Sequence, residues 1–274
     1  MADVPEVPDA QEPSGSSVLT DGTRELTLRA TDLDVTYRVY EDRRPRLREV
    51  VAGRGHRPNV REIKAVRGVS LEAYEGEAIG VIGHNGSGKS SLLRTLAGLM
   101  PPTAGEVFAV EQPILMGVSA ALRPAASGRR NILLGGLALG LTSDEIRDQI
   151  PEIIEFTGLE DFIDLPIRTY SSGMRARLYF AIGTMIRPRI LLVDEALAVG
   201  DDEFRARSKE RVDELLAEAG TVFLISHSRT AIGTICNRCI WMHGGRLRAD
   251  GEPEEILDQY QRYTRKQQRR RRSS

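Results

Sequence analysis

The segment from Gly83 to Ser91 constrains this chain more than any other, because its sequence, Gly-His-Asn-Gly-Ser-Gly-Lys-Ser-Ser, has the pattern of a phosphate-binding loop. Apolar residues precede it at 78–82 and follow it at 92–97, which predicts a strand, a glycine loop and a helix in that order. Glycines let successive backbone N–H groups point at phosphate oxygens, and the helix start adds the positive end of its dipole. The predicted nucleotide contacts in the loop are Gly83, His84, Asn85, Gly86, Ser87, Gly88, Lys89, Ser90 and Ser91.

Two residues of the loop and two at the end of a predicted strand are expected to bind the phosphates and Mg²⁺ and to activate the attacking water. Lys89 supplies a positive charge for the β- and γ-phosphates, and the Ser90 hydroxyl supplies a hard oxygen ligand for Mg²⁺. Asp194 ends a continuous apolar run, which is typical of a buried parallel strand, and is predicted to be the second Mg²⁺ ligand. Glu195 comes next and is predicted to be the general base or to position the attacking water.

Two further polar sites follow from strand and helix ends. His227 comes just after the apolar run 221–225, at the edge where ligands gather in parallel sheets, and is predicted to contact the γ-phosphate. Ser171 and Gly173 precede a predicted helix, whose start would form a second anion site. Because one nucleotide needs only one phosphate loop, the second site suggests a nucleotide held between two copies of the chain.

Taken together, these motifs resemble those of the nucleotide-binding subunits of ABC transporters. Residues 170–178 are similar to the family signature, with Met174 in place of its glutamine. Asp201 falls at the D-loop aspartate, His227 falls at the switch histidine, and Tyr37 is the best match to the adenine-stacking aromatic, with Tyr40 second. The resemblance adds these residues to the predicted ATP-binding set: Tyr37, Ser171, Ser172, Gly173, Met174 and Asp201.

The resemblance implies the α/β fold of a P-loop NTPase, as an ABC ATPase domain with a RecA-like core, an antiparallel β subdomain and a helical subdomain. The ends of the chain have few apolar residues, which predicts disorder there. The expected division is a disordered N-terminal extension at 1–23, an ABC ATPase domain at 24–263 with its helical subdomain at about 111–187, and a disordered basic tail at 264–274.

Variants of the family motifs indicate which subfamily the chain resembles. Tyr-Ser-Ser-Gly-Met at 170–174 and Ser-His-Ser at 226–228 are similar to those of exporters of lipid-linked polysaccharides of the galactan, O-antigen or teichoic acid type. This group implies ATP hydrolysis coupled to transport, a homodimer of ATPase subunits, two copies of a membrane permease, and a lipid-linked glycan bound through the permease. The expected location is peripheral, at the cytoplasmic face of the inner (plasma) membrane.

One motif of the broad family is missing. The usual glutamine loop would fall at 116–120, where there is no glutamine, and Gln112 lies too far upstream to take its place. The sequence therefore leaves open which side chain couples Mg²⁺ to the permease.

Composition limits the alternatives. The net charge of −1 gives no global case for nucleic acid, so no nucleic-acid partner is expected. Since no apolar run approaches the ~18–20 residues of a membrane span, a membrane role would require a partner. The alternative function is a soluble ABC-type ATPase that acts by nucleotide-dependent dimerisation in a non-transport complex. A third is a nucleotide-dependent regulator whose basic tail binds RNA.

Two segments keep more than one interpretation. The basic stretch 43–61 is either a solvated hairpin or loop, or a surface for anionic lipid head groups or a phosphorylated substrate. Cys236 and Cys239 form a C-x-x-C half-site near His243. A structural role is favoured over metal or redox chemistry, because the chain has no second cysteine pair.

Overall fold

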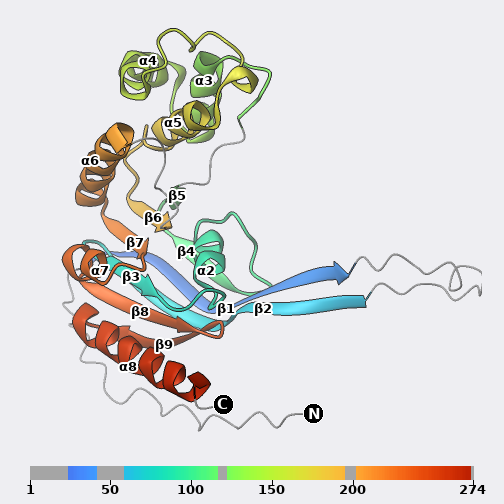
Figure 1. Ribbon diagram of the computed structural model, residues 1–274, viewed down its shortest axis with the longest axis vertical. Coiled ribbons are helices and arrows are strands. Elements are labelled where there is room, and N and C mark those ends of the chain that lie inside the picture. Colours follow the sequence, from blue (N-terminus) through green and yellow to red (C-terminus); the bar gives the residue numbers. More distant parts are fainter. Residues whose placement is uncertain (1–23, 42–58, 117–121, 195–201, 273–274) are drawn as a thin grey trace, which may run out of the picture.

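Two β-sheets form the body of the molecule in a computed structural model, which describes residues 24–41, 59–116, 122–194 and 202–272 (Figure 1). The six-stranded sheet has the order β5-β6-β7-β3-β8-β9 and is parallel except for β9. Its strands, in that order, are β5 (Ile114–Met116), β6 (Ile190–Asp194), β7 (Thr221–Ile225), β3 (Ala78–Ile82), β8 (Arg238–His243) and β9 (Arg246–Gly251).

The register of the parallel strands decides where the functional loops lie. Asp194 at the end of β6 pairs with Ile225 at the end of β7, and Ile225 also pairs with Val81 near the end of β3. All positions of β7, and all of β6 except Asp194, are buried, as expected for strands covered on both faces. The carboxyl ends of β3, β6 and β7 therefore meet at one edge of the sheet.

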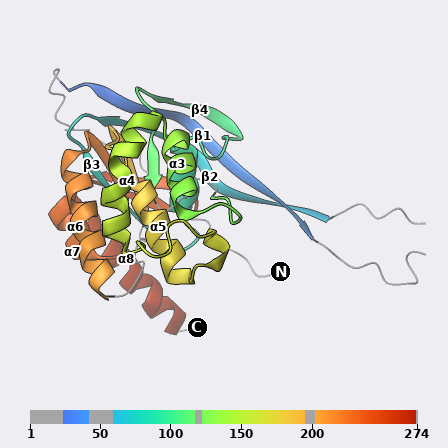
Figure 2. The ribbon, with the colours of Figure 1, turned by 90° about the horizontal axis from the view of Figure 1, so that it is seen from above.

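The second sheet is antiparallel and has the order β2-β1-β4. Strands β1 (Leu26–Glu41) and β2 (Asn59–Tyr74) pair from Leu26↔Tyr74 to Glu41↔Asn59, and β4 (Ala104–Ala109) pairs with the other edge of β1. The far ends of β1 and β2 form a ribbon that extends away from the rest of the molecule in both views (Figures 1 and 2). Most of the basic stretch 43–61 lies between these strands, at 42–58, outside the described residues.

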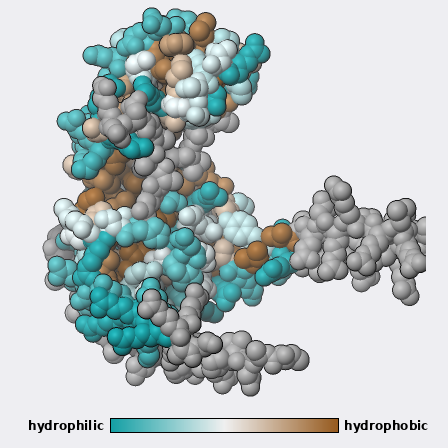
Figure 3. All heavy atoms as spheres, in the orientation of Figure 1, coloured by the Kyte–Doolittle hydropathy of each residue, from teal (hydrophilic) through white to brown (hydrophobic). Residues whose placement is uncertain are grey.

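Helices form a separate lobe above the sheets (Figure 1), and this lobe is the upper part of the space-filling view in the same orientation (Figure 3). It contains α3 (Gly128–Ala138), α4 (Ser143–Thr157), the short 3-10 helix η1 (Ile167–Thr169) and α5 (Ser172–Gly183), around an apolar core of its own. A capping box begins α4, in which Thr142 and Glu145 bond reciprocally. Proline disfavours a helix interior, but α4 continues through Pro151, because Ile146 and Ile153 pack in the lobe core. The helical subdomain expected at about 111–187 begins later in the structure, because residues 114–116 form β5 of the main sheet.

The remaining helices cover the six-stranded sheet. They are α2 (Lys89–Leu96), α6 (Asp202–Glu218), α7 (Arg229–Ile235) and α8 (Pro253–Arg272). Among the described residues, none of the helices combines the length and the apolar composition needed to cross a membrane.

The expectation that residues 264–274 are disordered is wrong as far as Arg272, because α8 continues to that residue. The apolar stripe of α8 consists of Ile256, Leu257, Tyr260 and Tyr263, and it packs on β8 and β9. Gln267 lies one helical turn after Tyr263, and its amide donates to the Tyr263 hydroxyl at 3.1 Å. Side-chain packing thus orders a segment whose composition predicts disorder.

Candidate nucleotide-binding site

The phosphate loop has the backbone conformation that its glycines allow. Gly86 and Gly88 have φ angles of 79° and 103°, in the left-handed region that other residues rarely adopt. A Cβ atom at Gly88 would also lie 2.2 Å from the carbonyl oxygen of Ala65. Both the dihedral angle and the space therefore require glycine at position 88, the N-cap of α2.

The back of the loop rests on the turn between β8 and β9. The Gly245 N–H donates to the Ser87 carbonyl at 3.0 Å, and the Arg67 N–H of β2 donates to the Gly245 carbonyl at 2.8 Å. These bonds connect the loop to both sheets. Sequence reasoning missed this support, for which the local signal is the Gly244-Gly245 pair in the turn between β8 and β9.

Lys89 begins α2 and is 7% exposed. Its ammonium group donates to the carbonyl oxygens of Gly83 at 2.7 Å and His84 at 3.2 Å. The loop therefore holds the positive charge of Lys89 at the start of the helix, where the dipole also favours an anion.

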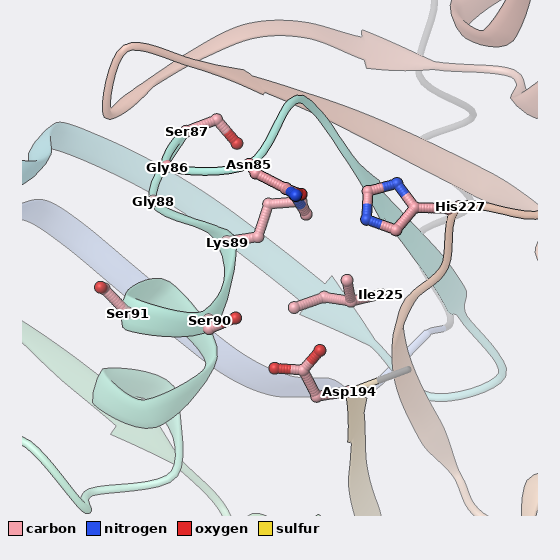
Figure 4. A pocket seen from close by; sticks show the side chains of 10 residues that line it. All are labelled: Asn85, Gly86, Ser87, Gly88, Lys89, Ser90, Ser91, Asp194, Ile225 and His227. Atoms are coloured by element: carbon pink, nitrogen blue, oxygen red, sulfur yellow. The ribbon is translucent and has the colours of Figure 1, made fainter. Parts of the chain in front are cut away.

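A cavity of about 520 Å³ opens in front of the loop. In Figure 4 the Ser90 hydroxyl and the Asp194 carboxylate point into this space from opposite sides, and His227 closes it above Ile225. The lining residues are Asn85, Gly86, Ser87, Gly88, Lys89, Ser90, Ser91, Asp194, Ile225 and His227. The structure thus brings together the predicted phosphate loop, metal ligand and histidine.

Comparison with known proteins identifies the fold. A family model described as ABC transporter matches residues 66–198. The teichoic acids export ATP-binding protein TagH of Shouchella clausii is 42% identical over 199 residues, which cover 73% of this chain and 55% of that protein. The chain therefore contains a domain of the ABC transporter family.

Two more relatives agree with this assignment. The O-antigen export system ATP-binding protein RfbB of Myxococcus xanthus is 41% identical over 199 residues, or 72% of this chain and 46% of that protein. A solved structure of an ATP binding subunit of an ABC transporter matches with a TM-score of 0.63 at 20% identity, covering 85% of this chain and 93% of that one. The predicted ABC ATPase fold is confirmed, although the chain spans only about half the length of these curated relatives.

The residues predicted to form the ABC signature lie in the helical lobe and are absent from the cavity lining. Ser171 is the N-cap of α5 and accepts a hydrogen bond from the Met174 N–H at 3.1 Å. Tyr170 is buried, and its hydroxyl donates to the Phe162 carbonyl at 2.6 Å. Ser171 and Ser172 are exposed. The start of α5 is therefore exposed and is held in place by the buried Tyr170. It does not line the cavity in front of the phosphate loop of its own chain.

Other predicted residues have different positions. Tyr37 lies on β1, does not line the cavity, and shares a hydrogen bond of 3.1 Å with Ser91. Its predicted adenine contact stays a prediction. Glu195 and Asp201 fall outside the described residues, as does the side chain of Tyr40.

The residues of the ABC ATPase site fit a magnesium nucleotide. The loop offers backbone N–H groups, a buried ammonium and the buried Ser87 hydroxyl, which has no hydrogen-bond partner among the described residues. Ser90 and Asp194 offer hard oxygen atoms. Across the described part of the chain no group of three or more His, Cys, Asp and Glu side chains is placed to hold a metal. Mg²⁺ suits such a site, because it binds through one or two protein oxygens and substrate phosphates.

Two residues that the sequence singled out have structural roles. The Gln112 amide donates to the Ala97 carbonyl at 2.6 Å, and so closes the end of α2 instead of lining the cavity. Cys236 and Cys239 are buried and unbridged, and burial raises the pKa of both thiols to about 12. Since the thiolate is the reactive form, this environment opposes metal binding and redox chemistry.

Proposed function

We propose that the chain is the nucleotide-binding subunit of an ABC exporter. It hydrolyses ATP to ADP and phosphate and thereby drives a lipid-linked polysaccharide of the galactan, O-antigen or teichoic acid type across the inner membrane. The observation that carries the ATPase part is the convergence of the phosphate loop, Asp194 and His227 on one cavity. The export part is supported by the similarity to teichoic acids export and O-antigen export ATP-binding proteins.

In this proposal each side chain has a defined task. Lys89 binds the β- and γ-phosphates, and Ser90 and Asp194 hold Mg²⁺, which neutralises charge on the phosphates when bound. Glu195 orients the attacking water and accepts its proton, and His227 contacts the γ-phosphate. The cavity thus positions a water molecule opposite the bond that is hydrolysed.

The active unit is proposed to be a homodimer. Ser171 to Met174 of one copy close over the nucleotide in the cavity of the other, and Asp201 lies at the same interface. This arrangement is supported by the exposed helix start at Ser171 and Ser172, which is absent from the lining of its own cavity. The γ-phosphate stabilises the closed dimer only, so hydrolysis reopens it. Two permease subunits are proposed to convert this cycle into transport, with the ATPase at the cytoplasmic face.

Co-purification tests the transport role. The full chain carries an affinity tag in its own host, and detergent-solubilised membranes are the starting material. The expected result is recovery of a multi-span permease with the wild-type chain, and accumulation of a lipid-linked glycan when the chain is depleted. ATP hydrolysis without a permease, and without lipid accumulation, would instead favour a soluble ATPase that acts by dimerisation in a non-transport complex.

A further inference from the structure

An aromatic cluster connects helix α8 to strand β8. The Trp241 ring lies 5.5 Å from the Tyr260 ring and 5.2 Å from the Tyr263 ring, measured between centroids. The Arg248 guanidinium of β9 lies 4.6 Å from the Trp241 ring centre and 4.5 Å from that of Tyr263. These contacts fix the position of Tyr263 on the sheet.

The end of β8 is also the back wall of the phosphate loop. A Cβ atom at Gly83 would lie 2.3 Å from the carbonyl oxygen of Met242, so the two backbones are in direct contact. The His243 ring, one residue further, meets the His84 ring edge to face at 5.2 Å. Movement of His243 would therefore be transmitted to the start of the loop.

A hydrogen-bonded series reaches this contact from the end of α8. The Gln267 amide donates to the Tyr263 hydroxyl at 3.1 Å, and this hydroxyl lies 3.2 Å from Nε2 of His243. Because the tyrosine oxygen accepts from Gln267, its own proton is available to His243. Nδ1 of His243 is buried and has no partner in the described part of the chain, so Nε2 makes the imidazole's only polar contact there.

The same contact leads to the charge that binds phosphate. The His84 carbonyl, together with that of Gly83, accepts the hydrogen bonds of the Lys89 ammonium. A shift of the His84 backbone would move these acceptors and the ammonium with them. The series thus runs from Gln267 through Tyr263, His243 and His84 to Lys89.

We infer that Tyr263 and His243 are positioning residues of the phosphate loop, and that Tyr263 acts through His243. This inference rests on the proposed nucleotide site and goes beyond it, because neither residue lines the cavity. It gives α8 a role in nucleotide binding through Tyr263, which accepts a hydrogen bond from Gln267 in the segment expected to be a disordered tail. Losing the Tyr263 hydroxyl removes one neutral hydrogen bond, so nucleotide affinity is expected to fall by about three- to tenfold.

The test uses the full chain with Tyr263→Phe, His243→Phe and the double variant. Tyr260→Phe is the matched control, because Tyr260 contacts Trp241 from the same helix, whereas in the described part of the chain the hydroxyl that lies within hydrogen-bond distance of His243 is that of Tyr263. The affinity of a non-hydrolysable ATP analogue with Mg²⁺, the KM and kcat for ATP, and the melting temperature without nucleotide are measured for each protein.

The expected result is a weaker affinity and a higher KM for Tyr263→Phe, with kcat unchanged and the affinity of Tyr260→Phe equal to that of the wild type; the melting temperature of Tyr263→Phe falls slightly, because the lost hydrogen bond is present without nucleotide. The double variant should bind as His243→Phe does, because the two residues act in series. Equal affinity of Tyr263→Phe and wild type, additive effects in the double variant, or a loss shared by Tyr260→Phe would each overturn the inference. Failure of the wild-type chain to bind the analogue would reject the nucleotide site itself.

Discussion

The ammonium nitrogen of Lys89 lies 2.7 Å from the carbonyl oxygen of Gly83, six residues earlier in the chain. This hydrogen bond keeps a buried positive charge inside the phosphate loop before any phosphate binds. The loop is therefore organised around its lysine, and the cavity presents a prepared anion site.

Lys89→Met tests this relationship. Loss of a charge-assisted contact to phosphate should weaken Mg-ATP binding by about ten- to a hundredfold, as measured by titration of a non-hydrolysable analogue. Arg94→Met is the control, because Arg94 lies on the exposed face of the same helix and away from the cavity. Equal losses of nucleotide affinity in the two variants would show that Lys89 acts only through the net charge of the protein.

Glu195→Gln separates hydrolysis from binding. A general base contributes about 10²- to 10⁴-fold to the rate, so ATP turnover should fall by at least about a hundredfold while analogue affinity is retained. Asp194→Asn is the partner variant and should instead lose the Mg²⁺ dependence of binding. Normal turnover of Glu195→Gln would rule out Glu195 as the base.

Ser171→Arg tests the shared site of the homodimer. The arginine should block the closed dimer and abolish cooperative ATP hydrolysis, while analogue binding to the open chain persists, because Ser171 does not line its own cavity. Thr142→Arg controls for the loss of an N-cap, since Thr142 caps the neighbouring helix α4. Unchanged hydrolysis by Ser171→Arg would contradict the sandwich.

Arg238→Met tests the connection between the two sheets. The Arg238 guanidinium bonds Glu77 at 3.1 Å, Asp250 at 2.6 Å and the Glu72 carbonyl of β2 at 2.8 Å. Its side chain is only 17% exposed, so removal leaves poorly hydrated carboxylates without a partner. The free energy of unfolding in urea should fall by about 3–5 kcal/mol.

The control for that prediction is Arg187→Met. Arg187 pairs with Glu218 at 2.8 Å, but its side chain is 72% exposed. Such a surface pair contributes about 0–1 kcal/mol. If the free energy of unfolding falls no more in Arg238→Met than in Arg187→Met, then Arg238 does not stabilise the contact between the two sheets.

The pH dependence of stability should depend on His243. Burial, followed by the neighbouring His84 and Arg248, lowers the pKa of His243 below its ordinary value. Between that lowered pKa and the ordinary value, the unfolded chain binds a proton that the folded chain does not, so stability falls as the pH decreases.

Urea titrations from about pH 7.5 to about pH 5 measure this effect. His243→Phe should lose less free energy of unfolding over this range than the wild-type chain. Parallel curves for the two proteins would show that His243 titrates alike in the folded and unfolded states.

Local chemistry explains which sequence predictions succeed. The phosphate loop is contiguous, and its glycines, lysine and serine act within one turn of helix, so the pattern alone predicts its conformation. The capping box at Thr142 is local in the same way. Asp194 and His227 also follow from pattern, because parallel strands bring their carboxyl ends to one edge.

The sequence predictions fail where contacts between residues far apart in the chain determine the local structure. Composition predicts that residues 264–274 are disordered, but Gln267 bonds to Tyr263, which packs on β8, and α8 continues to Arg272. Proline disfavours a helix interior, yet the core of the helical lobe keeps α4 continuous through Pro151. In both cases packing outweighs the local preference.

The sequence by itself determined that this chain has a phosphate loop, a strand-end aspartate and a family signature, because each depends on neighbouring residues. Only the tertiary structure decided that Met242, His243 and Gly245 form the back of the loop, and that α8 reaches this wall through Tyr263. The physical reason is that these contacts join residues far apart in the sequence, and no local pattern records which distant backbone or ring will fill the space behind a glycine loop.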